Sequence, residues 1–179
     1  MSEETIVKNW EEHPMLKPRI EKVVVNLNVG KSGEPLEKAN KVLKEITGQT
    51  PVKKKAKKTI RDFGIREGES IAVAVTLRKK KAIDFLKKVL PVVDNKVPKK
   101  SFDVRGNFAF GLKEHIEIPG VKYDPDIGIF GMDVCVSLEK EGLRVGRRRR
   151  AQARAGREQR VSKEEAVAFM KAKFGVEIR

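Results

Sequence analysis

The chain has 179 residues, with 40 Lys and Arg against 25 Asp and Glu, which gives a formal net charge of +15. So basic a chain favours an anionic polymer, nucleic acid above all, as its partner. A membrane-spanning or secreted protein is excluded, because no apolar run approaches the roughly 20 residues that cross a bilayer and the N-terminus is too polar for a signal peptide. We therefore expect one soluble, cytoplasmic domain.

The first part of the chain has the pattern of a strand followed by a helix. Residues 20–29 alternate between apolar and polar side chains and are rich in β-branched residues, which predicts a strand. Its polar face would carry Asn26 and Asn28. A helix is expected between Gly33 and Gly48, because apolar residues recur there at spacings of three or four.

Further strands and a second helix follow in chain order. Residues 51–58 are basic and predict an edge strand, and the β-branched run 70–78 predicts a further strand. A helix is expected at about 80–90. A turn-rich stretch then contains a predicted strand at 107–113, before the strand at 132–138.

The last helix is expected to begin at Ser162, where Ser162 and Glu165 have the spacing of a capping box, and to end at Gly175. The full order is a β-α-β-β-α-β core with an extra strand and a C-terminal helix. It predicts an α+β fold of two layers, a mainly antiparallel β-sheet with helices packed on one face and the second face free to bind. Cys135 lies in the apolar alternation of the last strand, so we expect a buried thiol without a disulfide.

Positive charge is concentrated in four blocks, and a merely solvated surface would not need so many. Aromatic residues make up only 6% of the chain, so charge should dominate over base stacking. The blocks are Lys53, Lys54, Lys55, Lys57, Lys58 and Arg61; Arg78 to Lys81; Lys96, Lys99 and Lys100; and the arginine-rich segment 144–160.

The segment 144–160 has eight Arg, one Glu and no apolar periodicity, so it predicts a basic arm without a core of its own. We expect this arm to be disordered in the free protein and to order on a partner. Arg147–Arg150 cannot share one face of a helix or a strand, which favours an extended arm surrounded by phosphates of folded RNA. A nuclear import signal is the alternative interpretation.

A nucleotide-binding enzyme is suggested by Gly30, Lys31 and Ser32, which follow a strand and precede a helix as in a phosphate-binding loop. The full pattern needs a glycine at position 25, which is Val25, so a plain strand-to-helix turn is favoured. No catalytic residue, metal or other cofactor is expected. The candidate zinc ligands are scattered singly along the chain, at His13, His115 and Cys135.

A single-strand RNA-binding module is suggested by residues 105–110, which are similar to the aromatic signature of the RNA recognition motif. The β-α-β-β-α-β order fits that module too, although Asn107 interrupts the signature. Phe108 and Phe110 share one face of the strand. We favour a place in the core for both rings over base stacking.

Five stretches in order resemble the L-five family of large-subunit ribosomal proteins, and together they cover almost the whole chain. The N-terminal extension and the arm depart from the bacterial pattern and resemble the archaeal and eukaryotic branch. The matching stretches are Lys22–Gly30, Ile46–Glu69, Val75–Arg78, Ser101–His115 and Ile129–Val134.

The resemblance implies a single RNA-binding domain over residues 1–179 that is a structural constituent of the ribosome and not an enzyme. Its sheet side would bind 5S rRNA in the central protuberance, and a loop would reach the P-site tRNA. Large-subunit rRNA and neighbouring ribosomal proteins would be further partners. Neither a membrane nor a small-molecule substrate is implied.

The resemblance also implies residues for these contacts. By motif, the RNA-facing network matches Asn26, Gln49, Phe63 and Thr76. Hydrogen-bonding capacity and charge add Asn28, Lys31, Lys53, Lys55, Lys57 and Arg78. The loop that approaches tRNA matches Thr59, Arg61, Phe63 and Arg66, with Phe63 either stacking on a base or anchoring the loop. The resemblance does not supply the contacts of the arm. There, charge alone predicts rRNA contacts at Arg147, Arg148, Arg149, Arg150 and Arg154.

Overall fold

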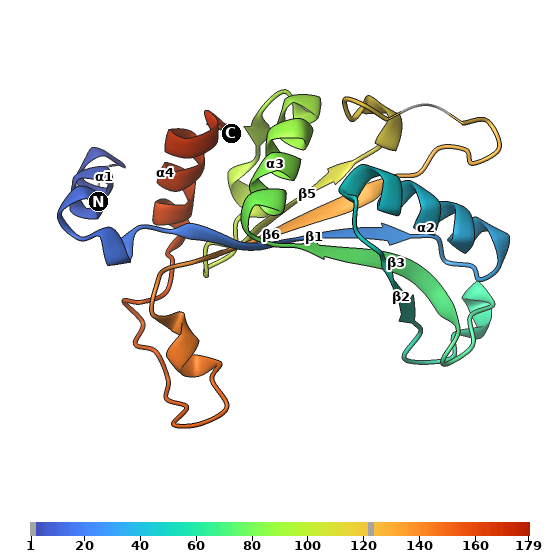
Figure 1. Cartoon of the computed structure of the whole chain (residues 1–179), viewed down its shortest axis with the longest axis horizontal. Helices are drawn as coiled ribbons and strands as arrows, with labels where there is room; N and C mark the ends of the chain where they lie inside the picture. Colours follow the sequence, from blue (N-terminus) through green and yellow to red (C-terminus); the bar gives the residue numbers. More distant parts are fainter. Residues whose placement is uncertain (1–2, 122–123) are drawn as a thin grey trace.

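The computed structural model describes residues 3–121 and 124–179, which form a five-stranded sheet with helices on one side (Figure 1). Every neighbouring pair of strands is antiparallel, in the order β2-β3-β1-β6-β5. The predicted two-layer α+β fold is therefore confirmed. The strands are β1 (Arg19–Asn28), β2 (Val52–Lys55), β3 (Ser70–Leu77), β5 (Phe108–Leu112) and β6 (Met132–Glu139).

Four helices are described, and Figure 1 shows them on the upper side of the sheet. They are α1 (Glu3–Glu12), α2 (Glu34–Thr47), α3 (Lys79–Val89) and α4 (Lys163–Phe174). A small parallel pair joins β4 (Lys96–Val97) to β7 (Glu177–Ile178). Within the described ranges, none of the helices combines the length and the apolarity that crossing a bilayer requires.

The core lies between the helices and one face of the sheet, and strand alternation places it there. Val23, Val25 and Leu27 of β1 are fully buried, whereas Asn26 and Asn28 lie on the opposite face. The register preserves this division across strands, because Val25 is paired with buried valines on both sides, Val75 of β3 and Val134 of β6.

Local signals set the helix ends as the sequence predicted. In α2, Pro35 occupies the first turn and Gly48 ends the helix in the left-handed conformation, with φ of 61°. In α4, the Ser162 hydroxyl accepts a hydrogen bond from the Glu165 amide at 3.2 Å. The Glu165 carboxylate accepts one from the Ser162 amide at 2.8 Å, which completes the predicted capping box.

Two aromatic predictions are confirmed and the cysteine prediction is wrong. Phe108 and Phe110 face the core at 3% and 8% exposure, and the Phe108 ring stacks on Phe102 at a centroid distance of 4.8 Å. Cys135 is exposed instead of buried. The reason is the period of two along β6, since Val134 and Val136 take the helix-covered face and leave Cys135 on the other.

The buried His115 fastens the loop between β5 and β6. Its backbone amide donates to the Phe130 carbonyl at 3.0 Å, and its Nδ1 accepts a hydrogen bond from the Phe130 amide at 3.2 Å. Burial lowers the pKa of the His115 imidazole, which favours the neutral ring that this acceptor role requires. His115 is thus a structural residue of the fold.

Candidate nucleic-acid interface

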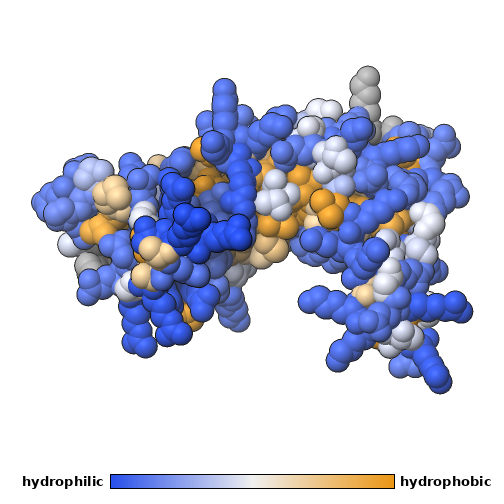
Figure 2. Space-filling model, turned by 60° about the horizontal axis from the view of Figure 1, so that its bottom comes forward, coloured by the Kyte–Doolittle hydropathy of each residue, from blue (hydrophilic) through white to orange (hydrophobic). Residues whose placement is uncertain are grey.

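None of the four described α-helices covers the opposite face of the sheet, and among the described residues only the arm approaches it, at one end (Figure 1). Figure 2, which turns this underside toward the viewer, shows a neutral and apolar middle between two strongly hydrophilic regions. Many side chains there are small, so the backbone of a ligand can approach the strands closely. The residues of this open face include Val24, Asn26, Asn28, Ala72, Ala74, Thr76, Ala109, Gly111, Cys135 and Ser137.

Amide and hydroxyl groups on β1 and β3 give the open face its hydrogen-bonding capacity. The Asn26 Nδ2 donates to the Asn28 Oδ1 at 3.1 Å, which orients the two side chains relative to each other. Asn28 and Thr76 are exposed, and Thr76 lies opposite Val24 in the register. Each amide keeps unused donors or acceptors, as recognition of a polar ligand requires.

A depression on the open face brings together Gln49 and Thr76, two of the residues that are expected to face RNA. It has a volume of about 320 Å³ and lies where the end of α2 meets β2 and β3. The Gln49 Oε1 is buried and has no hydrogen-bond partner among the described residues. A buried acceptor without a partner is costly, so a donor from a ligand would be stabilising here. The lining residues are Val24, Gln49, Thr50, Val52, Lys54, Ala74, Val75 and Thr76.

The lysines of the edge strand β2 point to different sides of the sheet. Lys53 lies opposite the buried Val73, and its ammonium pairs with Glu37 of α2 on the helix side. That hydrogen bond lowers the pKa of the Glu37 carboxyl. Lys54 lies opposite Ala72 and joins the open face. The motifs did not single out Lys54, because its orientation depends on the strand register.

Three further predicted lysines and an arginine lie around this face. Lys55 follows a bulge in β2 and lies opposite Ser70. Lys31 and Lys57 are exposed in loops. Arg78, just before α3, is held by Glu21 at 3.5 Å.

The loop after β1 is a strand-to-helix turn, as predicted. The backbone amides of Val29 and Gly30 both donate to the Ile71 carbonyl, at 3.1 and 2.9 Å. Ser32 donates its hydroxyl hydrogen bond to Glu69. The amides of Val29 and Gly30 are therefore already occupied and are not available to a phosphate group.

The β2–β3 connection is an ordered hairpin extension that projects from one end of the sheet (Figure 1). Ile60 and Ile65 pair through backbone hydrogen bonds of 2.9 and 3.1 Å, and the Thr59 hydroxyl accepts from the Glu67 amide at 3.0 Å. Arg61 begins a 3-10 turn that closes the tip. The exposed tip residues include Arg61, Phe63 and Arg66.

Phe63 is 73% exposed at this tip. A ring that anchored the loop would be buried against it, so the anchoring interpretation is wrong. The side chain is instead presented to solvent beside Arg61, where an aromatic face is available for stacking.

The arginine-rich arm extends below the sheet, on the side away from the helices (Figure 1). It opens with a short 3-10 turn, Leu143–Gly146. Arg147 is bonded to acidic residues of the sheet, and Arg148 donates to the Ala151 carbonyl at 2.7 Å. Within residues 3–121 and 124–179, no hydrogen bond or ion pair engages the side chains of Arg149, Arg150 and Arg154.

Two family models match the chain in succession. Residues 13–66 match the model described as ribosomal protein L5, and residues 70–169 match the model for the C-terminus of the same ribosomal family. Together the two matches run from before β1 into α4. They cover the open face, the hairpin extension and the arm.

Curated relatives agree with these matches over nearly the full chain. The chain is 58% identical to the large ribosomal subunit protein uL5 of Pyrobaculum aerophilum over 166 residues, which cover 93% of each protein. It is 51% identical to the uL5 of Aeropyrum pernix over 172 residues, covering 96% of this chain and 90% of that protein. The uL5 of Sulfurisphaera tokodaii is 54% identical over 167 residues, with 93% and 94% covered.

These matches agree with a basic surface built around an uncovered sheet face. They identify a ribosome-bound structural component instead of an enzyme. The chain belongs to the ribosomal protein L5 family, of the archaeal type, and is a structural constituent of the large ribosomal subunit.

Proposed function

We propose that the open face of the sheet binds 5S rRNA in the central protuberance of the large subunit, in the cytoplasm. The observation that carries this proposal is the uncovered face itself, which carries Asn26, Gln49 and Thr76 and lies between two basic projections, the hairpin extension and the arm. An RNA helix laid across the sheet would meet small and uncharged side chains, some with amide or hydroxyl groups, and cations on both sides.

The two kinds of residue have different tasks in this proposal. Lys54, Lys55 and the exposed arm arginines Arg149, Arg150 and Arg154 neutralise phosphates, which gives affinity without sequence preference. Asn26 and Gln49 hydrogen-bond to ribose and base edges, which gives preference for the cognate RNA. The arm extends the contact along the same RNA, and large-subunit rRNA is a further partner.

The alternative, a single-strand module of the RNA recognition type, has lost its main support. Such a module stacks bases on aromatic rings of the exposed sheet face. Phe108 and Phe110 lie on the opposite, buried face. A folded RNA is therefore favoured over an unpaired strand.

The proposal is tested by comparing variants on 5S rRNA and on a random RNA duplex. Asn26→Ala and Gln49→Ala are each expected to weaken 5S binding by about 1–3 kcal/mol, with a smaller loss on the duplex. Lys54→Ala combined with Lys55→Ala is expected to weaken both RNAs alike. Dissociation constants from fluorescence anisotropy measure each variant on each RNA.

Lys53→Ala is the matched control, because this lysine of the same strand is paired with Glu37 on the helix side. It should change binding less than the Lys54 and Lys55 pair. Equal losses on 5S rRNA and on the duplex for Asn26→Ala would refute the division of roles. A preference of the unmodified protein for unpaired oligomers would support the recognition-motif alternative.

We further infer that the hairpin extension contacts the P-site tRNA through its tip. Phe63→Ala is expected to raise the dissociation rate of P-site tRNA from reconstituted ribosomes on the order of fivefold, because one aromatic stack is lost. Val104→Ala is the control, since Val104 is also an exposed apolar residue, at 91%, but in a different turn. Equal rates for the two variants would exclude a role of the tip.

A further inference from the structure

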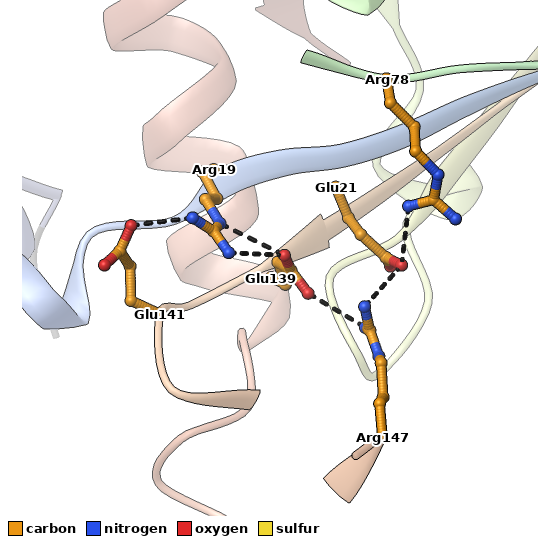
Figure 3. A network of polar contacts seen from close by, with 6 residues as sticks. All are labelled: Arg19, Glu21, Arg78, Glu139, Glu141 and Arg147. Carbon is orange, nitrogen blue, oxygen red and sulfur yellow. Dashed lines mark hydrogen bonds and ion pairs between the residues drawn. The ribbon is translucent and has the colours of Figure 1, made fainter. Parts of the chain in front are cut away.

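The base of the arm is joined to the sheet by a network of charged side chains (Figure 3). Arg147 bridges two acidic residues of adjacent strands: its guanidinium lies 2.7 Å from a Glu21 oxygen and 3.0 Å from a Glu139 oxygen. Glu139 also binds Arg19 at 3.0 Å, and Glu21 also binds Arg78 at 3.5 Å.

Burial makes Glu21 and Glu139 the fixed part of this network. Their side chains are only 12% and 10% exposed, whereas the Arg147 side chain is 53% exposed. Carboxylates so nearly buried need their cationic partners, because an unpaired buried charge is strongly unfavourable. Arg147 is therefore held by the sheet, although it belongs to the arm by sequence.

Each of the two carboxylates is shared between two guanidinium groups. Arg147 is the cation that both carboxylates bind. Arg105 and Arg160 line the same pocket of about 430 Å³, beside Arg147, and their side chains form no ion pair with the described residues. Glu21 and Glu139 thus bind Arg147, whereas the guanidinium groups of Arg105 and Arg160 remain available to a ligand.

The far end of the arm is fixed by a second contact. Lys140 is buried, with 4% of its side chain exposed, and donates to the Glu158 carbonyl at 3.0 Å. It also binds the Glu165 carboxylate at 2.8 Å, which links it to the cap of α4. The segment between Arg147 and Glu158 is consequently a loop with both ends held.

We propose that Glu21 and Glu139 are positioning residues that seat Arg147 and so aim the arm. In this assignment Arg147 does not bind RNA, and Arg149, Arg150 and Arg154 bind phosphates. The inference rests on the proposed binding of rRNA by the arm. It limits the disorder expected of the free arm to the residues between Arg147 and Glu158, where the two ends are held.

Holding Arg147 against the sheet should raise the affinity of the arm for RNA. An arm whose exit direction is fixed loses less conformational freedom when RNA orders it, so a larger part of its contact energy becomes affinity. Removing the seat should therefore weaken binding without removing a phosphate contact. Removing a phosphate contact should change the salt dependence instead.

The first experiment measures the free protein, without RNA. Nitroxide labels are placed on the exposed Cys135 and on Gly156→Cys, where a side chain meets no described atom within 4 Å. Pulsed electron resonance should give a narrow distance distribution that Arg147→Gln broadens. Glu139→Gln should broaden it too, and the double variant should add little further, because both changes break the same contact.

Glu141→Gln is the matched control, since Glu141 binds Arg19 at 2.8 Å and does not take part in the contact with Arg147. Its distribution should remain narrow. If Arg147→Gln left the distribution of label-to-label distances unchanged, the proposal that Glu21 and Glu139 position the arm through Arg147 would be wrong. Arg147 is half exposed, so this variant remains testable even where removal of a nearly buried carboxylate prevents folding.

The second experiment compares the salt dependence of 5S rRNA binding by Arg147→Gln and by Arg149→Gln. Each of these variants loses one positive charge. Arg149→Gln should reduce the slope of log K against log salt by about 0.9. Arg147→Gln should leave the slope unchanged and weaken binding roughly two- to tenfold. An equal drop in slope for Arg147→Gln would show that it contacts phosphate and refute its seated role.

The two experiments test separately whether Glu21 and Glu139 position the arm through Arg147 and whether the arm binds RNA. A narrow distribution that Arg147→Gln broadens, together with an unchanged slope for Arg149→Gln, would support the seat and refute RNA binding by the arm. The distance measurement contains no RNA, so failure of the RNA-binding proposal leaves its result intact.

Discussion

Raising the salt concentration from 50 to 200 mM is expected to weaken binding of 5S rRNA by roughly a thousandfold to a hundred-thousandfold. This range follows if about 6–10 phosphates are neutralised, because each neutralised phosphate releases a condensed counterion. The open face, the base of the hairpin extension and the arm carry enough cations for the lower end of that range: Lys54, Lys55, Lys57, Arg149, Arg150 and Arg154. Titrations over a series of salt concentrations give the slope directly.

The arm should account for a definite share of this slope. Replacing Arg149, Arg150 and Arg154 together by Gln is expected to reduce the slope by about 2.7, three times the value for one phosphate. The core should be unaffected, because these side chains make no contact with it that the structure describes. A nearly flat salt response of the unmodified protein would contradict the whole electrostatic mechanism.

Gly106→Ala is expected to be the most destabilising of the single glycine substitutions, by about 2–5 kcal/mol. A Cβ at Gly106 would lie 2.7 Å from Val161 Cγ1 and 3.2 Å from the Ala166 Cβ, in a backbone conformation with φ of +72°. The cost combines left-handed strain with overpacking against the start of α4. The turn has little freedom to relax, because the Asp103 carboxylate accepts hydrogen bonds from two amides around it, at 2.8 Å each.

Gly68→Ala separates these two contributions. Gly68 has a similar φ of +80°, but a Cβ there meets no described atom within 4 Å. The left-handed backbone strain alone should lower the free energy of unfolding of Gly68→Ala by about 1–2 kcal/mol. Urea denaturation of both variants measures the difference, and equal losses would mean that the contact with Val161 relaxes without cost.

Most of the fold was predictable because its elements have strong local patterns. The alternation in β1 assigned Val25 to the core and Asn26 to the open face, and the same period assigns Cys135 to the open face once it is applied strictly. The helix α1 was missed. Its buried face, which includes Ile6 and Trp10, is too short for a clear helical period, and it is stabilised by packing against α4.

The candidate interface was predictable only in part. Motifs pointed to Gln49 and Thr76, which the fold brings to one depression. The sequence analysis named Lys53 and left out Lys54, because the side of the sheet on which each lysine lies depends on the pairing of β2 with β3. The contact of Arg147 with Glu21 was out of reach, since it joins residues 126 positions apart and charge patterns carry no information at that separation.

The edge strand β2 also matters for the protein before it is assembled. Because β2 is an edge strand, one of its sides has no neighbouring strand in the sheet and its backbone groups there could pair with another sheet edge. All four of its residues are exposed. Three of the four are lysines, whose charges repel an identical strand from a second copy. The lysines that the proposal assigns to phosphates would thus also keep newly made chains from aggregating through this edge until RNA takes its place beside it.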